Sequence, residues 1–303
     1  MPSEPLLPIR EIARLTGVNP VTLRAWERRY GLVVPQRTSK GHRLYSSDQV
    51  QRIQAIVSWL NRGVAVSQVL PLLDSDPSPA TQNSGDDWNV LSTQLTNSIA
   101  HLGERQLDQQ FNQAMALYPA STLCEQLLLP LFAQLEVRWQ VHPCAAVERA
   151  FFHSWLRSKL GLRVYHNNRQ LSGVPALLLS AGNQPFDPHL WLCAWLVSDG
   201  GCPVEVFDLP LHGRDLALAV DRLKAGALLL SLNKVADSEQ LQRDLNPLKV
   251  PKLLFGAAVT LHKQALGMDP DWHLLDSPLA AQRCLQGLGT LAPHSPDGTT
   301  SCN

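Results

Sequence analysis

Basic side chains that could bind phosphate are concentrated in the first quarter of the chain. Residues 1–73 contain ten Lys and Arg against four Asp and Glu, a net charge of +6, whereas the 303-residue chain as a whole is neutral. The remaining residues therefore carry a net charge of −6. A guanidinium group binds phosphate oxygens through paired, charge-assisted hydrogen bonds. This asymmetry predicts that residues 1–73, and not the rest of the chain, bind a polyanion such as duplex DNA.

Short helices must position these basic groups, and the sequence predicts four of them. They cover about residues 9–17, 19–31, 46–63 and 65–73, and a glycine ends each of the first three. Asn19 followed by Pro20 is typical of a helix N-terminus, because the Asn side chain caps free backbone N–H groups and proline suits the first turn. Between the second and third helices, residues 33–46 have two short extended runs around a Lys40-Gly41 turn, which predicts a β-hairpin.

The spacing I-x-E-I-A-x-x-T-G-V-x-x-x-T-L-R-x-W-E-R-R-Y-G-L-x-x-P-x-R-x-x-x-G-x-R-L-Y, from Ile9 to Tyr45, closely resembles the winged helix-turn-helix of the MerR family. The resemblance implies that residues 1–73 are a DNA-binding head whose second helix enters the major groove. The implied partner is a double-stranded promoter operator, and RNA polymerase is a further expected partner.

The expected DNA-binding residues divide by role. The resemblance assigns base reading to Pro20, Val21 and Thr22, and backbone contacts to Arg24 and Tyr30. The hairpin, or wing, is expected to place four residues against phosphates and the groove edge, namely Arg37, His42, Arg43 and Tyr45. Asn19, Thr22, Arg24, Arg28 and Arg29 are expected to point outward from the second helix, and Lys40 completes the set of expected DNA contacts.

The sequence after the head departs from a typical MerR protein, in which a long coiled-coil helix follows. Here the last head helix is expected to stop near Leu73, before a linker at 74–87 that is rich in Pro, Ser and Asp. We therefore expect a head that is tethered to the body rather than fused to it, and homo-oligomers that form through residues 88–303.

The body is expected to have two parts. Residues 88–168 contain four segments with helical periodicity, which favour an antiparallel four-helix bundle. Residues 174–290 alternate short apolar strands with helices, which is typical of an α/β Rossmann-like parallel sheet. The expected strands lie at 175–182, 203–209, 227–233, 251–258 and 272–276. Residues 291–303 are expected to be a frayed tail.

A helical bundle followed by a five-stranded α/β unit, behind such a head, resembles the cobalamin-binding light sensors of the CarH type. In that group a W-x(9)-E-H signature covers the upper face of the cofactor. Here Trp139 and Glu148 are one residue too close, and Arg149 replaces the histidine. A shift of one residue turns a helical side chain by about 100°.

The lower axial histidine of that group has no clear counterpart. Counting back from Gly200 places Pro185 at its position, and proline has no lone pair to give to cobalt. His189 in Asp187-Pro188-His189 is the alternative, at the cost of about one helical turn. Ser231 and Gly256 sit where the group grips the nucleotide tail, so with Trp139 and Glu148 they are candidates for a residual pocket. We expect no cofactor; a cobalamin-dependent light sensor remains the alternative.

The motifs R-A-W-E-R-R-Y-G-L and P-Q-R-T-x-x-G-H-R-L, with L-W-L-x-x-W at Leu190–Trp195, are similar to the MlrA-like branch of the MerR family. That branch keeps the sensor architecture without the cobalamin ligands and includes regulators of biofilm matrix genes. The sequence has no catalytic motif such as G-x-S-x-G, a P-loop or H-E-x-x-H, so we expect no enzyme activity. Its six cysteines form no C-x-x-C pair, which argues against a zinc site. The absence of a long apolar run or signal peptide predicts a cytoplasmic location and no membrane contact.

Overall fold

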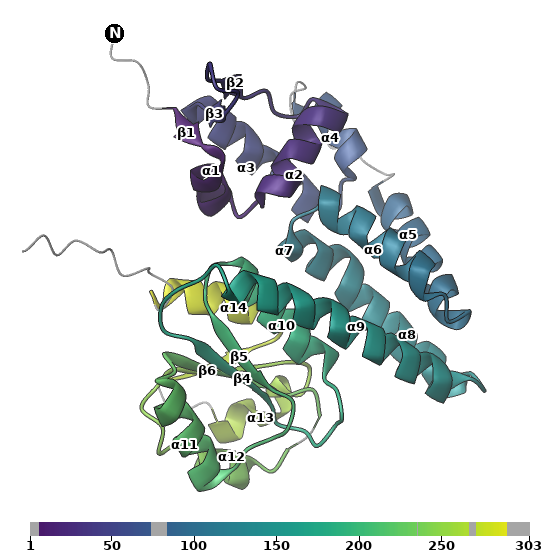
Figure 1. Cartoon of the computed structure of the whole chain (residues 1–303). Coiled ribbons are helices and arrows are strands. Elements are labelled where there is room, and N and C mark those ends of the chain that lie inside the picture. Colours follow the sequence, from purple (N-terminus) through teal and green to yellow (C-terminus); the bar gives the residue numbers. More distant parts are fainter. Residues whose placement is uncertain (1–5, 74–83, 235, 267–270, 290–303) are drawn as a thin grey trace, which may run out of the picture. The chain divides into compact units, whose positions relative to one another are not determined.

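The computed structural model describes residues 6–73, 84–234, 236–266 and 271–289. Internal contacts divide the chain into two units, Met1–Phe152 and His153–Asn303, and helix α9 (Ala145–Asn168) belongs partly to each (Figure 1). The expected frayed tail and most of the expected linker lie outside the described residues. Within that linker range, helix α5 (Ser84–Ala100) already begins at Ser84.

The first part of the first unit consists of short helices and a small antiparallel sheet. The elements are β1 (Leu7–Pro8), α1 (Ile9–Thr16), α2 (Pro20–Ala25), the π-helix η1 (Trp26–Tyr30), β2 (Gln36–Arg37), β3 (Arg43–Tyr45), α3 (Ser47–Asn61) and α4 (Val66–Leu73). The expected cap is present, because the Asn19 side chain accepts hydrogen bonds from the N–H groups of Val21 and Thr22, both at 2.9 Å. Strands β2 and β3 pair as the hairpin pattern predicts, and β1 adds a strand that the sequence did not indicate.

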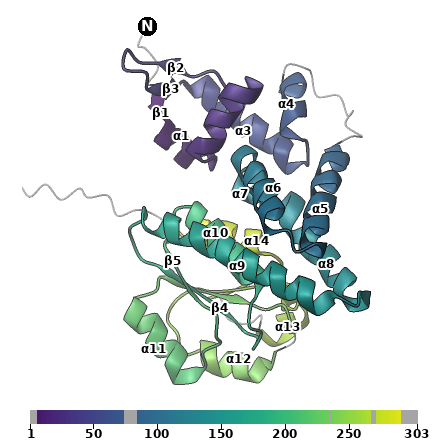
Figure 2. The ribbon, with the colours of Figure 1, turned by 45° about the vertical axis from the view of Figure 1, so that its right-hand side comes forward.

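Helices make up the remainder of the first unit. Helix α5 is followed by α6 (Glu104–Leu117), and α7 (Ala120–Leu123), η2 (Cys124–Leu128) and α8 (Leu129–Val141) then follow one another directly. Helices therefore occur in each of the four segments with helical periodicity. Figure 2 shows α5, α6 and α8 beside one another, and contacts join α5 to both α6 and α8.

The expected head, described from residue 6 to residue 73, is packed against these helices. The fully buried Trp26 donates its indole N–H to the carbonyl of Leu117 at 2.8 Å, and Trp88 donates to the carbonyl of Gly63 at 2.8 Å. Asn61 accepts hydrogen bonds from Thr122 and Gln126 through its side chain and its carbonyl. The structure thus differs from the expectation of a tethered head, because polar groups of the head find their partners on α5, α6, α7 and η2.

A five-stranded parallel sheet forms the core of the second unit. Its order is β5-β4-β6-β7-β8, from β4 (Ala176–Ser180), β5 (Val204–Phe207), β6 (Ala227–Ser231), β7 (Lys252–Phe255) and β8 (Trp272–Leu275). All five expected strands are present. The two central strands have the sequence Ala-Leu-Leu-Leu-Ser and are buried along their whole length, as strands covered on both faces must be.

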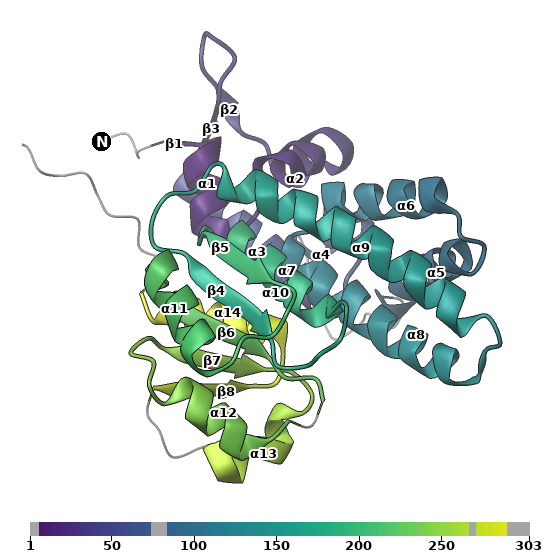
Figure 3. The same ribbon diagram turned by 60° about the horizontal axis from the view of Figure 1, so that its bottom comes forward.

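Helices cover both faces of this sheet. Helices α10 (Pro188–Asp199) and α14 (Pro278–Gly287) pack together, and α11 (Gly213–Leu223), α12 (Ser238–Leu245) and α13 (Val259–Leu266) contact one another in sequence. Figure 3 shows the parallel strands with these helices around them. Helices α13 and α14 were not among those expected from the sequence. No helix in the described residues combines the length and the apolar character needed to cross a bilayer.

Replacing Trp88 by Phe tests how firmly the head is held. The change keeps an aromatic ring beside Tyr118, whose ring centroid lies 4.5 Å away, but removes the N–H that binds the Gly63 carbonyl. An unsatisfied buried carbonyl costs about 1–2 kcal/mol, so we expect the free energy of unfolding of the first unit to fall by that amount in chemical denaturation. Trp59→Phe is the control, because the half-buried Trp59 ring stacks on the Arg62 guanidinium. Equal losses in the two variants would contradict this account.

Candidate functional site

The exposed part of helix α2 carries several of the expected DNA-binding residues. Val21 is 58% exposed, Arg24 is exposed, and Asn19 and Pro20 are half-buried at the helix N-terminus. Arg28, in the following η1, is also exposed. Thr22 is fully buried, which contradicts the expectation that it points outward to read bases. The physical reason is that α2 packs against both α1 and α6, so that only part of its surface is left exposed.

Tyr45 is a second expected contact residue that is not at the surface. Its side chain is fully buried at the end of β3, and no described residue provides a hydrogen-bond partner for its hydroxyl. Burial raises the pKa of Tyr45. The expectation that Tyr45 lies at the groove edge is therefore wrong, since its ring belongs to the core beneath the hairpin. Tyr30, at the end of η1, is half-buried.

The hairpin presents the remaining expected residues. Arg37, Lys40 and His42 are exposed and Arg43 is half-buried. The turn of the hairpin is closed by two backbone hydrogen bonds. Thr38 N–H donates to the His42 carbonyl at 2.9 Å, and Gly41 N–H donates to the Thr38 carbonyl at 2.8 Å. These bonds close the turn, so the basic side chains lie on one short hairpin.

Glu27 holds two of these arginines, a role that the sequence analysis missed. Its carboxylate accepts a hydrogen bond from Arg37 at 2.6 Å and a second, from Arg43, on its other oxygen. Burial opposes ionisation of Glu27, but the hydrogen bonds from Arg43 and Arg37 outweigh it and lower the pKa of this carboxyl. Glu27 is therefore a positioning residue for two cations. The sequence signal that could have indicated this role is an acidic residue directly after Trp26, within a region of basic residues.

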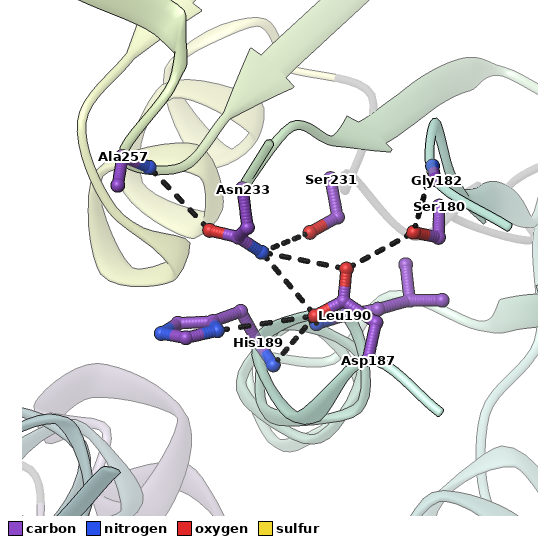
Figure 4. Close-up of polar contacts among 8 residues, drawn as sticks. All are labelled: Ser180, Gly182, Asp187, His189, Leu190, Ser231, Asn233 and Ala257. Carbon is purple, nitrogen blue, oxygen red and sulfur yellow. Dashed lines mark hydrogen bonds and ion pairs between the residues drawn. The ribbon is translucent and has the colours of Figure 1, made fainter. Parts of the chain in front are cut away.

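In the second unit, polar side chains meet where strands β4 and β6 end (Figure 4). Asp187 caps α10 by accepting hydrogen bonds from the N–H groups of His189 and Leu190, and it also accepts one from the Ser180 hydroxyl at 3.1 Å. The Asn233 amide donates to Asp187 and, at 2.8 Å, to the hydroxyl of Ser231. A closed network thus joins the two central strands.

The residues expected near a cobalamin lie around this network. Nδ1 of His189 is 3.9 Å from the Asp187 carboxylate in the first turn of α10, and Pro185 is exposed in the preceding loop. Gly256 has φ +127°, and a side chain there would come within 2.6 Å of the Asn233 amide oxygen. The space next to Ser231 and Gly256 is therefore filled by Asn233.

Trp139 and Glu148 contact each other in the first unit. Glu148 is 2% exposed and accepts hydrogen bonds from Arg138 at 2.8 and 2.9 Å and from the Trp139 indole at 3.2 Å. The guanidinium of Arg138 is the main cause of the lowered pKa of Glu148, since its hydrogen bonds outweigh the effect of burial. Arg149 stacks on the Trp139 ring and pairs with Glu136. Among the described residues, no group of His, Cys, Asp or Glu is arranged to hold a metal ion.

Comparison with known proteins identifies the family of this chain. Residues 7–76 match the MerR HTH family of regulatory proteins. The chain is 34% identical over 201 residues to the HTH-type transcriptional regulator MlrA of Salmonella typhimurium, a match that covers 66% of this chain and 79% of that protein. The chain belongs to the MerR family.

Two repressors are similar over a shorter part of the chain. The HTH-type transcriptional repressor CarA of Myxococcus xanthus is 31% identical over 137 residues, which is 45% of this chain and 46% of that protein. CarH of the same organism is 23% identical over 157 residues, or 49% and 52% of the two chains. The chain is thus a MerR-family, DNA-binding transcriptional regulator that is similar to MlrA, with a CarH-like region behind its head.

Replacing Arg138 by Met should unbalance the buried Glu148. The variant leaves the buried carboxylate of Glu148 without the guanidinium that pairs with it, and we expect the free energy of unfolding at pH 7 to fall by about 2 kcal/mol. A carboxyl whose pKa is lowered by folding adds stability above its unfolded pKa and loses it as the pH falls through its folded pKa. The difference between wild type and variant should therefore shrink from about pH 5 downward.

Chemical denaturation over a series of pH values measures this difference. Arg149→Met is the matched control, because its ion pair with Glu136 is exposed on both sides and such pairs contribute little. A loss in Arg138→Met that is as large at pH 3 as at pH 7, on the scale of about 2 kcal/mol, would contradict the assignment.

Proposed function

We propose that this MerR-family regulator reads a promoter operator with a winged helix-turn-helix made of α1, α2 and the β2–β3 hairpin. The observation that carries the proposal is the joint exposure of α2 and the hairpin, with basic side chains on both elements. In such heads the helix lies in the major groove and flanking elements contact the backbone.

The proposed contacts follow the exposure of each residue. Asn19, Pro20 and Val21 face the base edges, and Tyr30 and the basic residues contact the backbone: Arg24, Arg28, Arg37, Lys40, His42 and Arg43. Phosphate contacts give affinity for every sequence, while contacts to base edges give the choice of operator. Selection of bound genomic fragments in vitro tests this division. The Val21→Ala variant should select a different operator sequence from the wild type.

The body is proposed to be the regulatory part of the molecule. We propose that residues 88–168 act as a helical bundle, that residues 174–290 form a sensor-like α/β domain, and that homo-oligomers form through residues 88–303. RNA polymerase is the proposed downstream partner and the cytoplasm the proposed location. By likeness to the MlrA-like branch, biofilm or matrix genes are the proposed targets.

We further propose that the regulator works without cobalamin. Three observations support this: Pro185 and not histidine occupies the expected ligand position, Asn233 fills the space beside Ser231 and Gly256, and Glu148 is already satisfied by Arg138 and Trp139. The alternative, a cobalamin-dependent light sensor, draws on the similarity to CarA and CarH.

DNA binding by the full chain should depend strongly on salt and on Arg43. A protein that makes 6–10 phosphate contacts loses roughly 10³-fold or more in affinity between about 50 and 200 mM salt. Arg43→Ala should weaken binding to all duplexes alike and reduce the slope of log affinity against log salt by about 1. Fluorescence anisotropy with operator and random duplexes measures both effects. Arg62→Ala, at the end of α3 and outside the proposed interface, should leave the slope unchanged; equal effects of the two substitutions would argue against this interface.

Incubation with adenosylcobalamin in the dark, followed by desalting, tests cofactor independence. We expect the protein to elute without a visible absorption band, and its affinity for DNA to be the same in darkness and in light. Retention of a stoichiometric cobalamin band that His189→Ala abolishes would refute the proposal and establish the light-sensor alternative.

A further inference from the structure

A cavity of about 380 Å³ lies in the second unit, where strands β4 and β6 end. Its volume is in the range of small-molecule sites, roughly 300–1,000 Å³. In a sheet of order β5-β4-β6-β7-β8, the β4–β6 pair is the point where the strand order reverses, and open α/β sheets bind ligands in the crevice at that point. The residues that line it do not include His189, Ser231 or Gly256. Asn233 and Asp187 of the polar network form part of its wall, and the cavity extends from there toward α11 and α12.

The inner part of this cavity is apolar. Four buried leucines line it, one from α11, one from β6 and two from α12, namely Leu216, Leu230, Leu241 and Leu245. All four are buried in the hydrophobic core between the sheet and these helices. A ligand that enters must therefore present an apolar body to this floor.

The polar lining of the cavity carries excess negative charge. Three carboxylates line it, from Asp187, Asp237 and Asp244, against the single lysine or arginine among the described lining residues, Lys234. Asp187 and Asp244 are 6% and 5% exposed. A concave site with carboxylates and low-dielectric walls concentrates negative potential and favours cations over anions.

The hydrogen bonds of these carboxylates leave that charge in place. Asp244 accepts from Gly213 N–H and the Gln240 amide, both at 2.8 Å, and lies 2.8 Å from Nδ1 of His212. No lysine or arginine pairs with it among the described residues. Asp237, at the rim, caps α12 through Oδ1, and its other oxygen has no partner in the described chain.

We propose that this cavity binds a small organic cation, an amine carried on an apolar body. The apolar body packs on the four leucines, and the ammonium group lies at the rim, where it donates to the free oxygen of Asp237. This site goes beyond the proposed function and does not depend on it, because it uses none of the residues assigned to DNA.

Three indoles that differ in charge test the proposal on the full chain: tryptamine is a cation, tryptophol is neutral and indole-3-acetate is an anion at neutral pH. Isothermal titration calorimetry at low salt should rank their affinities in that order, with tryptamine at least about tenfold tighter than indole-3-acetate, because the Coulomb energy changes sign. Added salt should weaken tryptamine binding. Indole-3-acetate binding as tightly as tryptamine, or no binding of tryptamine at millimolar concentration, would overturn the proposal.

Two variants locate the site. Asp237→Asn keeps a side chain that can cap α12 but removes one charge, so tryptamine affinity should fall about threefold or more. Its control is Asp215→Asn in the exposed first turn of α11, outside the cavity, which should have no effect. Ala236→Trp should fill the cavity and abolish tryptamine binding, with circular dichroism as the test of folding. Equal effects of the two Asp substitutions, or unchanged binding in a folded Ala236→Trp variant, would place the amine elsewhere and overturn the assignment.

Discussion

The fully buried indole of Trp26 sets the geometry of the DNA-binding head. A buried N–H without an acceptor is energetically costly. The indole N–H of Trp26 has its acceptor outside its own helix, because it donates to the Leu117 carbonyl at the end of α6. This bond ties the junction of α2 and η1 to the helices behind the head. The next residue, Glu27, lies between Arg37 and Arg43 of the hairpin. Two adjacent residues thus connect the head to the body on one side and to its wing on the other.

A different constraint governs the sheet of the second unit. Parallel strands bring their carboxyl ends to one edge, where loops carry polar groups that need partners. Asn233 meets this need by contacting Asp187, Ser231 and the N–H of Ala257. Gly256 allows the close approach, because its φ of +127° is unfavourable for other residues and a Cβ atom there would lie only 2.6 Å from the Asn233 amide oxygen. At the carboxyl ends of the strands, side chains of the protein fill the space beside β6 and β7, and the cavity lies toward α11 and α12.

Buried carboxylates in the two units differ in how their charge is balanced. Glu148 is paired with Arg138 and also accepts from Trp139, so its charge is neutralised where it lies. Asp187 accepts from hydroxyl, amide and backbone groups, which satisfy its hydrogen bonds without cancelling its charge. The first arrangement stabilises a helix pair, whereas the second leaves a negative potential in a cavity. Glu148 therefore belongs to a structural ion pair, whereas Asp187 belongs to the proposed binding site.

The sequence by itself determined the local elements and the family. Asn19 caps α2, the hairpin forms, and the two Ala-Leu-Leu-Leu-Ser runs become central strands, because each pattern depends on residues a few positions apart or on continuous burial. Only the tertiary structure decided which side chains of the head remain exposed. Thr22 and Tyr45 are buried and Glu27 holds two arginines. The docking bond of Trp26 joins residues 91 positions apart. Periodicity within one helix cannot show that a second helix covers it, because the covering residues lie far away in the chain.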